Sequence, residues 1–149
     1  MQLVTFNIGN TRYAIDTQWI MEIIPFIATA KLSCPQKFIV GTANYRGTPI
    51  PVIDLGIILE DKPSRLRMST RMLVIKYPGN NGETLPLALI VERATNIISV
   101  DAEFATDLAD TLDNVQFLGK TIHDDDGMLQ IIDPTRALKK SLNLAMEVS

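Results

Sequence analysis

The chain has 149 residues, of which 46% are hydrophobic and 21% charged, and its formal net charge at pH 7 is −3. This length and composition are those of a folded domain with a proper core, and they exclude an intrinsically disordered chain. The acidic balance argues against nucleic-acid binding, because such proteins need a dense basic face to displace counterions from phosphate.

The cysteine content and the apolar stretches indicate the compartment. Cys34 is the only cysteine, so an intrachain disulfide is excluded and a reducing environment is expected. The chain starts with a strand-like segment rather than an apolar leader. Its longest apolar stretch, 50–59, is interrupted and far shorter than the roughly twenty apolar residues of a membrane span. We therefore expect a cytoplasmic protein that reaches a membrane only through a partner.

Alternating apolar residues at the N-terminus predict a β-hairpin. Val4, Phe6 and Ile8 recur with period two, which places them on the buried face of a strand. The Gly-Asn pair at 9–10 tolerates positive φ, so it is expected to turn the chain into a second strand at 11–15.

Two further strands are predicted before the middle of the chain. Asp16 has the chemistry of an N-cap and predicts a short helical turn. The apolar segment 19–24 follows as a strand, and Pro25 ends it because proline lacks the backbone donor. Pro35 is expected to open a turn that leads into the next strand, 38–45.

The run GTANYRGTPIPVIDL, which begins at Gly41, has the most distinctive pattern. Gly41 permits a close backbone approach or a bulge, and Arg46-Gly47 makes a tight reversal with positive φ at Gly47. Pro49 and Pro51 cannot donate to a ladder, which predicts a sheet edge or a bulge on that side. An apolar edge of this kind is suited to docking another protein. A rigid turn with an exposed arginine is an equally good interpretation.

The segment after this run is predicted to be a helix followed by a linker. Asp54 can cap, and good helix formers follow it, so we expect a short helix there. The polar stretch 60–70 is the preferred candidate for an internal linker. The best candidate for a basic cluster lies in and just after this stretch. It consists of Arg65, Arg67 and Arg71, which we expect to be solvated.

The second half of the chain continues the β pattern. The segments 71–77 and 85–92 are predicted to form a hairpin, and 95–100 a further strand. The acidic, weakly patterned stretch 101–114 is expected to be a long loop.

The C-terminal part predicts a last hairpin and a helix. The strands are 115–122 and 128–133, and the Asp-Gly pair at 126–127 is a strong two-residue turn signal. Asp133 as N-cap and Pro134 at the first helical position start a helix. The apolar face of this helix consists of Ala137, Leu138 and Leu142.

The number and spacing of these elements determine the predicted fold class. Around ten short strands, separated by turn residues, favour small β-barrels over βαβ units. Ten strands suit two five-stranded barrels better than one sandwich. We therefore predict a mainly β fold with short helices.

The residues give little support for catalysis or metal binding, so we predict a non-enzymatic binding module without a cofactor. His123 precedes three aspartates, but ligands on adjacent residues do not easily converge on one ion, and a solvated turn is favoured. Cys34 has no reactive context, and no glycine-rich phosphate loop is present. Most of the candidate paired carboxylates have a capping role instead; the candidates are Asp16, Asp54, Asp101 and Asp133.

Five segments occur in an order that is more informative than any one of them. They are LVTFNIG at 3–9 with YAID at 13–16, IMEI at 20–23, NYRG at 44–47 with PVIDL at 51–55, LIVE at 89–92, and LQIID at 129–133. In this order they resemble the CheW family of chemosensory coupling proteins, and the likeness covers nearly the whole chain.

The resemblance implies a fold and a role. The fold would be two interleaved five-stranded SH3-like β-barrels in a single CheW-like domain over 1–149, with subdomain one at about 11–83 and subdomain two at about 1–10 plus 84–149. Family members have no catalytic activity. They bridge the cytoplasmic hairpin tip of a methyl-accepting chemoreceptor to the regulatory domain of a CheA-type histidine kinase, in the cytoplasm at membrane-associated receptor arrays.

The resemblance also implies site residues. Ile20 and Gly41 match family positions tied to kinase binding. Ile39 and Arg46 match positions associated with the receptor, and Glu22 lies where the family places the partner of that arginine. The positions that correspond to the family's structural motif are Asn44, Tyr45, Gly47, Pro51 and Asp54.

Some residues depart from the family pattern, and other functions stay open. Tyr45 stands where the family usually has leucine, and Glu92 where it often has aspartate. In Ser-Cys-Pro at 33–35, the usual apolar residue before the proline is missing. The Ser-Thr-Arg segment at 69–71 is similar to adaptors of alternative systems, such as those that control a diguanylate cyclase. The alternatives are a β-barrel sensor for a small ligand and a fragment of a kinase's regulatory portion.

Overall fold

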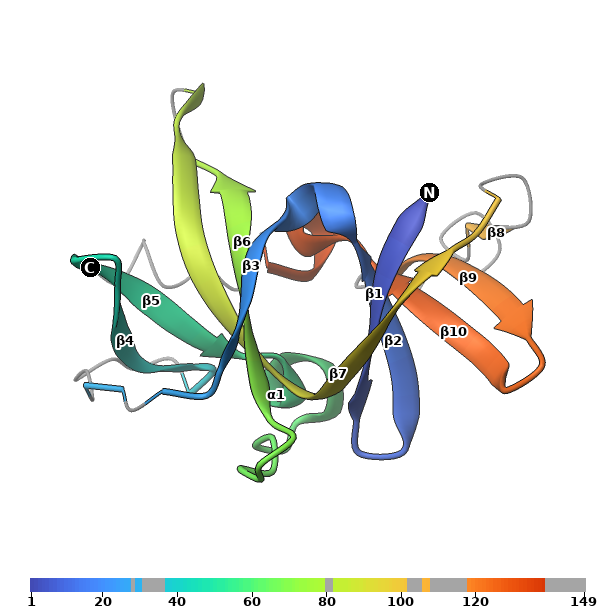
Figure 1. Ribbon diagram of the computed structural model, residues 1–149, viewed down its shortest axis with the longest axis horizontal. Helices are drawn as coiled ribbons and strands as arrows, with labels where there is room; N and C mark the ends of the chain where they lie inside the picture. Colours follow the sequence, from blue (N-terminus) through green and yellow to red (C-terminus); the bar gives the residue numbers. More distant parts are fainter. Residues whose placement is uncertain (28, 31–36, 80–81, 102–105, 108–117, 139–149) are drawn as a thin grey trace. The chain divides into compact units, whose positions relative to one another are not determined.

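The computed structural model describes residues 1–27, 29–30, 37–79, 82–101, 106–107 and 118–138 (Figure 1). Within these residues the chain is mainly β, as predicted, with ten strands and short helices. It divides into two compact units. Unit 1 comprises 1–18 with 95–149, and unit 2 comprises 19–94.

Unit 1 begins with the predicted hairpin. Strand β1 (Gln2–Ile8) pairs antiparallel with β2 (Thr11–Asp16), and the turn between them contains Gly9 at φ 59°. The predicted inward face is buried; it consists of Val4, Phe6 and Ile8. The predicted cap also forms, because Asp16 accepts a hydrogen bond from the backbone N–H of Gln18 at the start of η1 (Thr17–Trp19).

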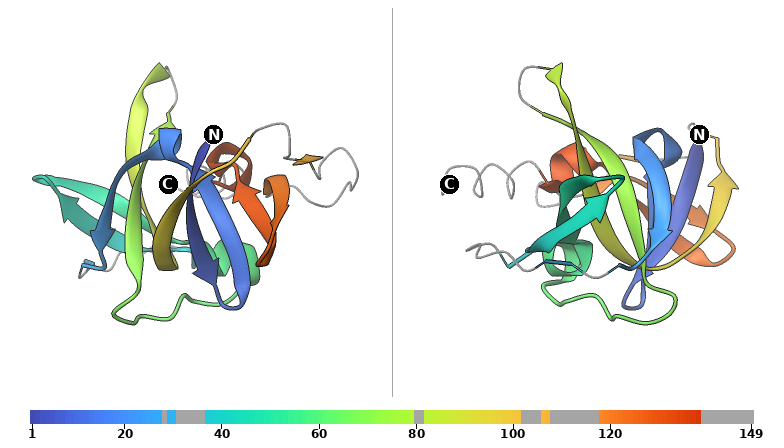
Figure 2. Two further views of the ribbon diagram at one scale, coloured as in Figure 1. Left: turned by 45° about the vertical axis from the view of Figure 1, so that its right-hand side comes forward. Right: turned by 60° about the vertical axis from the view of Figure 1, so that its left-hand side comes forward.

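The C-terminal strands complete this sheet. Strands β9 (Leu118–Asp124) and β10 (Gly127–Ile132) form the predicted hairpin, and β8 (Thr106–Asp107) pairs with β9. The turn lies at 125–126, one residue before the predicted position, because Asp124 pairs directly with Gly127. Strand β10 lies parallel to β2, so the first and last hairpins share one sheet (Figure 2). Their buried cluster consists of Leu3, Ala14, Ile122, Leu129 and Ile131.

Unit 2 contains the remaining strands. Strands β3 (Ile20–Pro25), β6 (Arg71–Pro78) and β7 (Thr84–Ser99) lie side by side in that order. The hairpin of β4 (Ile39–Tyr45) and β5 (Thr48–Asp54) joins them through a parallel pairing of β5 with β7. The core between these strands consists of Ala43, Ile50, Val52, Met72, Val74, Ala88 and Ile90.

Strand β7 differs from its prediction as two separate strands. It is continuous over 16 residues and runs from unit 2 into unit 1, where it neighbours β1. Arg93, at φ 49°, interrupts the regular extended backbone without ending the strand. The polar residues near it therefore mark a local change in backbone rather than a turn.

The prediction of an internal linker at 60–70 is wrong. Glu60 ends helix α1 (Leu55–Glu60), and the following residues connect α1 to β6 inside unit 2. Backbone and side-chain hydrogen bonds tie this segment down at both Ser64 and Thr70. Polar composition misled the prediction because these polar groups form hydrogen bonds, at Thr70 within the loop and at Ser64 with Asp54 outside it.

The last described residues form the predicted helix start. Asp133 accepts a hydrogen bond from the backbone N–H of Thr135, and a helical segment occupies 134–138. Ala137 and Leu138 are buried as expected. Several predictions lie outside the described residues: Cys34, Pro35, Leu142 and most of the loop at 101–114.

Within the described ranges, none of the helices has the length and apolarity that a membrane crossing requires. The division into two five-stranded barrels, with boundaries near 10 and 83, stays a prediction.

Candidate functional site

The turn between β4 and β5 has an unusual backbone. Tyr45 pairs with Thr48, which leaves Arg46 and Gly47 as a two-residue turn. Both have positive φ, 51° and 84°, as a type I′ hairpin turn requires. Asn44 stabilises the turn because its side-chain oxygen accepts a hydrogen bond of 2.9 Å from the Gly47 N–H. The sequence predicted positive φ at Gly47 but not at Arg46.

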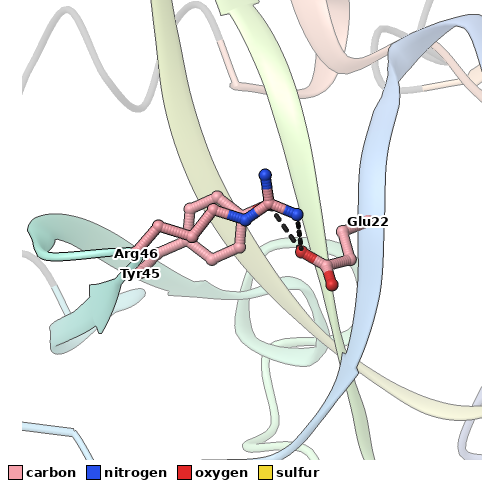
Figure 3. Close-up of polar contacts among 3 residues, drawn as sticks. All are labelled: Glu22, Tyr45 and Arg46. Carbon is pink, nitrogen blue, oxygen red and sulfur yellow. Dashed lines mark hydrogen bonds and ion pairs between the residues drawn. The ribbon is translucent and has the colours of Figure 1, made fainter.

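Three side chains meet beside this turn (Figure 3). The Glu22 carboxylate on β3 accepts a hydrogen bond of 2.6 Å from the Tyr45 hydroxyl and one of 3.3 Å from Arg46 Nη2, both at Oε2. The Arg46 guanidinium also lies over the Tyr45 ring, 5.3 Å from its centroid. We call these three residues the hairpin-tip site.

The hairpin-tip site holds a cation in place and leaves it accessible. The Arg46 side chain is 74% exposed and that of Glu22 38%. An exposed ion pair of this kind contributes only about 0–1 kcal/mol to stability. The tyrosine ring and the carboxylate instead favour one orientation of the arginine, and the exposure of its side chain leaves further N–H donors accessible to a partner. The arrangement is therefore suited to recognising a partner's carboxylate or carbonyl groups.

The electrostatics of the site predict an alkaline transition. The hydrogen bond to Glu22 raises the pKa of Tyr45 above its usual value of 10.0, desolvation adds to the rise, and Arg46 opposes it. Neutral tyrosine donates this bond, so the contact is complete below pH 10 and is lost as the pH rises through the raised pKa.

We expect the Glu22→Gln variant to ionise Tyr45 at lower pH than the wild type, because the carboxylate that favours the neutral phenol is gone. Near-ultraviolet absorbance of tyrosinate, followed against pH, measures this difference. The Tyr45→Phe variant identifies which step of the titration belongs to this residue. An identical Tyr45 step in wild type and Glu22→Gln would show that the hydrogen bond is absent in solution.

A bulge in β3 separates two of the predicted site residues. Ile20 pairs with Ile75, whereas Glu22 pairs with Val74, so the register shifts between them. Directly opposite residues project to the same face of a sheet, and neighbours along a strand project to opposite faces. Ile20 and Glu22 therefore face opposite sides, although their i, i+2 spacing alone predicts a shared face. The bulge assigns the predicted kinase and receptor residues of this strand to different surfaces.

The other two predicted contact residues lie on β4, away from its tip. Ile39 is half-buried at the first position of the strand and pairs with Ile53. The length of β4 places it about 20 Å from Arg46 along the backbone. The structure thus joins Arg46 to Glu22 and does not join it to Ile39.

Gly41 is buried, and the Thr29–Ala30 segment covers it. A Cβ built on it would lie 2.3 Å from the backbone oxygen of Ala30. Ala30 and Thr42 form a β-bridge with hydrogen bonds of 2.8 and 2.9 Å. The register of β4 also shifts between Ile39 and Gly41. Both the close approach and the bulge predicted for Gly41 are therefore confirmed.

The two prolines of β5 lie as the sequence predicts. Because Tyr45 and Thr48 close the turn, the next hydrogen-bonded pair is Ala43 with Ile50, and Pro49 and Pro51 point their nitrogens away from β4. Pairing of β5 with β7 on that side begins only at Val52. The prolines therefore occupy an open edge, where a missing donor costs no ladder hydrogen bond.

Asp54 has a structural role. Its buried carboxylate caps α1 by accepting from the Gly56 N–H at 2.9 Å, and it also accepts from the backbone N–H and the hydroxyl of Ser64. Gly56 permits this packing, because a Cβ there would lie 2.7 Å from the Lys62 carbonyl oxygen. Asp54 thus fixes the loop after α1 to the end of β5.

Sequence reasoning missed the function of the Tyr45 hydroxyl. It noted the tyrosine as a departure from leucine, and the only available signal was that a phenol adds a hydrogen-bond donor beside a predicted Glu–Arg pair. Among the residues that the structure describes, no three His, Cys, Asp or Glu side chains could hold a metal ion together.

Comparisons with known proteins point to one family. The CheW-like domain model matches residues 2–141. The chain is 31% identical over 106 residues to chemotaxis protein CheW of Treponema pallidum and 24% identical over 102 residues to that of Klebsiella aerogenes, covering 68% of this chain in both cases. These matches span 59% and 58% of the two relatives' own lengths.

A solved structure has the same fold. The scaffolding protein TtCheW from Thermoanaerobacter tengcongensis superposes with a TM-score of 0.74 at 25% identity, over 89% of this chain and 83% of the other. The family model, the relatives and the solved structure therefore agree with one another and with the mainly β architecture.

Proposed function

Since the chain belongs to the CheW-like domain family of scaffold proteins, we propose that it couples the cytoplasmic tips of methyl-accepting chemoreceptors to the regulatory domain of a CheA-type histidine kinase. In this role it works without catalysis or cofactor, in the cytoplasm, recruited to membrane-associated receptor arrays. The observation that supports this proposal most directly is the exposed Arg46 held by Glu22 and Tyr45.

We assign receptor binding to Arg46, Glu22 and Ile39. An adaptor binds more tightly when its polar contact group is already oriented, because less side-chain entropy is lost on binding. The contacts of Arg46 with Glu22 and Tyr45 meet that condition. Ile39 supplies half-buried apolar surface farther along β4. The type I′ turn, built by Asn44 and Gly47, keeps the arginine at the end of the hairpin.

We assign kinase binding to Ile20 and to the surface that Gly41 supports. Ile20 faces the side of β3 opposite Glu22, so one chain can engage two partners at once. Gly41 acts through the Thr29–Ala30 segment that covers it. We also propose that unit 2 and unit 1 correspond to the two subdomains of the family fold.

Replacing Arg46 with Glu should weaken binding to the receptor tip at least tenfold, because a repulsive charge takes the place of an oriented donor. The free energy of unfolding should change by less than about 0.5 kcal/mol, as expected for an exposed position. Isothermal titration calorimetry against the receptor hairpin tip and urea unfolding measure the two effects.

The Lys76→Glu variant is the matched control, because it makes the same charge change at another exposed position of unit 2. It should bind the receptor tip as the wild type does. Equal affinities of Arg46→Glu and wild type would contradict the assignment of the hairpin-tip site. A chain that binds neither receptor nor kinase would contradict the adaptor function itself.

A further inference from the structure

The loop between α1 and β6 carries two exposed apolar side chains on an ordered backbone. Leu66 is 64% exposed and Met68 is 98% exposed. Both lie in the segment 62–71, which we call the basic loop. Figures 1 and 2 show it at a different end of unit 2 from the β4–β5 turn, so it is not part of the hairpin-tip site.

Hydrogen bonds fix the backbone on both sides of these side chains. The Thr70 hydroxyl donates to the Arg65 carbonyl at 2.6 Å and accepts from the Arg67 N–H at 2.8 Å. The Arg71 guanidinium donates to the Met68 carbonyl at 2.6 Å, and the Arg93 N–H donates to that of Ser69 at 3.2 Å. The loop is therefore already ordered before any partner arrives, which lowers the entropy that binding must overcome.

Further contacts anchor the loop to the sheet. Asp54 holds Ser64 through both carboxylate oxygens, and Glu92 accepts from the Arg65 backbone N–H at 3.2 Å. The residues that make these contacts alternate with Leu66 and Met68, which point outward. The hydrogen bonds that order this segment thus also hold Leu66 and Met68 at the surface.

The charge of the loop is opposite to that of the rest of the chain. Four of the 14 Lys and Arg residues lie in it, and none of the 17 Asp and Glu residues. Among the described residues, no carboxylate forms an ion pair with Lys62, Arg65 or Arg67, and all three are exposed. The basic loop is therefore complementary in charge to an acidic partner. The rest of the chain, which is acidic, is not.

The composition of the loop favours a protein over a lipid surface. Arginine and methionine are enriched at protein interfaces, where arginine pairs with carboxylates and methionine adapts to irregular pockets. Interfacial membrane segments use tryptophan and tyrosine as anchors, and the basic loop has no aromatic residue. We propose that the basic loop is a docking surface for an acidic protein segment, with Met68 and Leu66 as apolar anchors and Arg65 and Arg67 as partners for its carboxylates.

Site-specific photo-crosslinking in the native cells tests this proposal on the full chain, with p-benzoylphenylalanine in place of Met68. Mass spectrometry of the product should identify a cross-linked peptide with net negative charge. The Arg65→Glu/Arg67→Glu double variant should reduce its yield at least fivefold. The same photoreactive group in place of Ile97, which is 63% exposed, is the matched control and should not give this peptide.

The proposal is overturned if the photoreactive group at 68 gives no more protein product than at 97, if the captured peptide is not acidic, or if charge reversal leaves the yield unchanged. Loop-dependent sedimentation with phosphatidylglycerol vesicles, in place of a peptide, would assign the loop to a membrane and also overturn it. Because this test does not use Arg46, it can fail or succeed independently of the proposed adaptor function.

Discussion

Replacing Asp54 with Ala should lower the free energy of unfolding by about 3 kcal/mol. The substitution removes the N-cap of α1 and leaves the buried N–H of Gly56 and both donors of Ser64 without their acceptor. For a chain of this size the loss corresponds to a fall of roughly 6–12 °C in the unfolding midpoint. Urea unfolding and thermal unfolding measure it.

Asp133→Ala is the matched control, because Asp133 also caps a helical segment but is only half-buried. Its loss should be about 1 kcal/mol, the usual effect of removing an N-cap. Equal losses in the two variants would show that Asp54 acts only as a cap. The loop contacts of Ser64 would then contribute nothing to stability.

Gly41→Ala should lower the free energy of unfolding by about 2–3 kcal/mol. The new Cβ would lie 2.3 Å from the Ala30 oxygen, and a backbone atom cannot move aside as the end of a side chain can. The β-bridge between Ala30 and Thr42 should open. Faster amide hydrogen exchange at these two residues is the specific result to measure.

Gly9→Ala distinguishes this steric effect from ordinary backbone strain. Gly9 has φ 59° and no heavy atom within 4 Å of a built Cβ, so alanine there costs about 1–2 kcal/mol through its left-handed backbone alone. The exchange rates of Ala30 and Thr42 should not change in this control. If Gly41→Ala also left them unchanged and still abolished kinase binding, Gly41 would be a direct contact residue instead.

Local chemistry explains which elements could be predicted. Period-two patterning placed Val4, Phe6 and Ile8 on a buried face, and the chemistry of N-caps placed the starts of η1 and α1. These features depend on residues close together in sequence. They need no knowledge of what packs against them.

The features that escaped prediction depend on distant partners. The separation of Ile20 from Glu22 results from a register shift against β6, which no pattern within β3 reveals. The Tyr45–Glu22 hydrogen bond joins residues 23 positions apart. The basic loop was mistaken for a linker because its order comes from pairings with Asp54, Glu92 and Arg93.

The parallel pairing of β2 with β10 has a consequence for synthesis on the ribosome. Tyr13 pairs with Gln130, so the β2 edge of the N-terminal hairpin has no partner strand until residues more than a hundred positions later are synthesised. At about 5–20 residues per second this delay is roughly 6–25 s. All of unit 2 is made within that interval. The nascent chain therefore exposes an unpaired strand edge, which other chains can pair with, until the last hairpin is made.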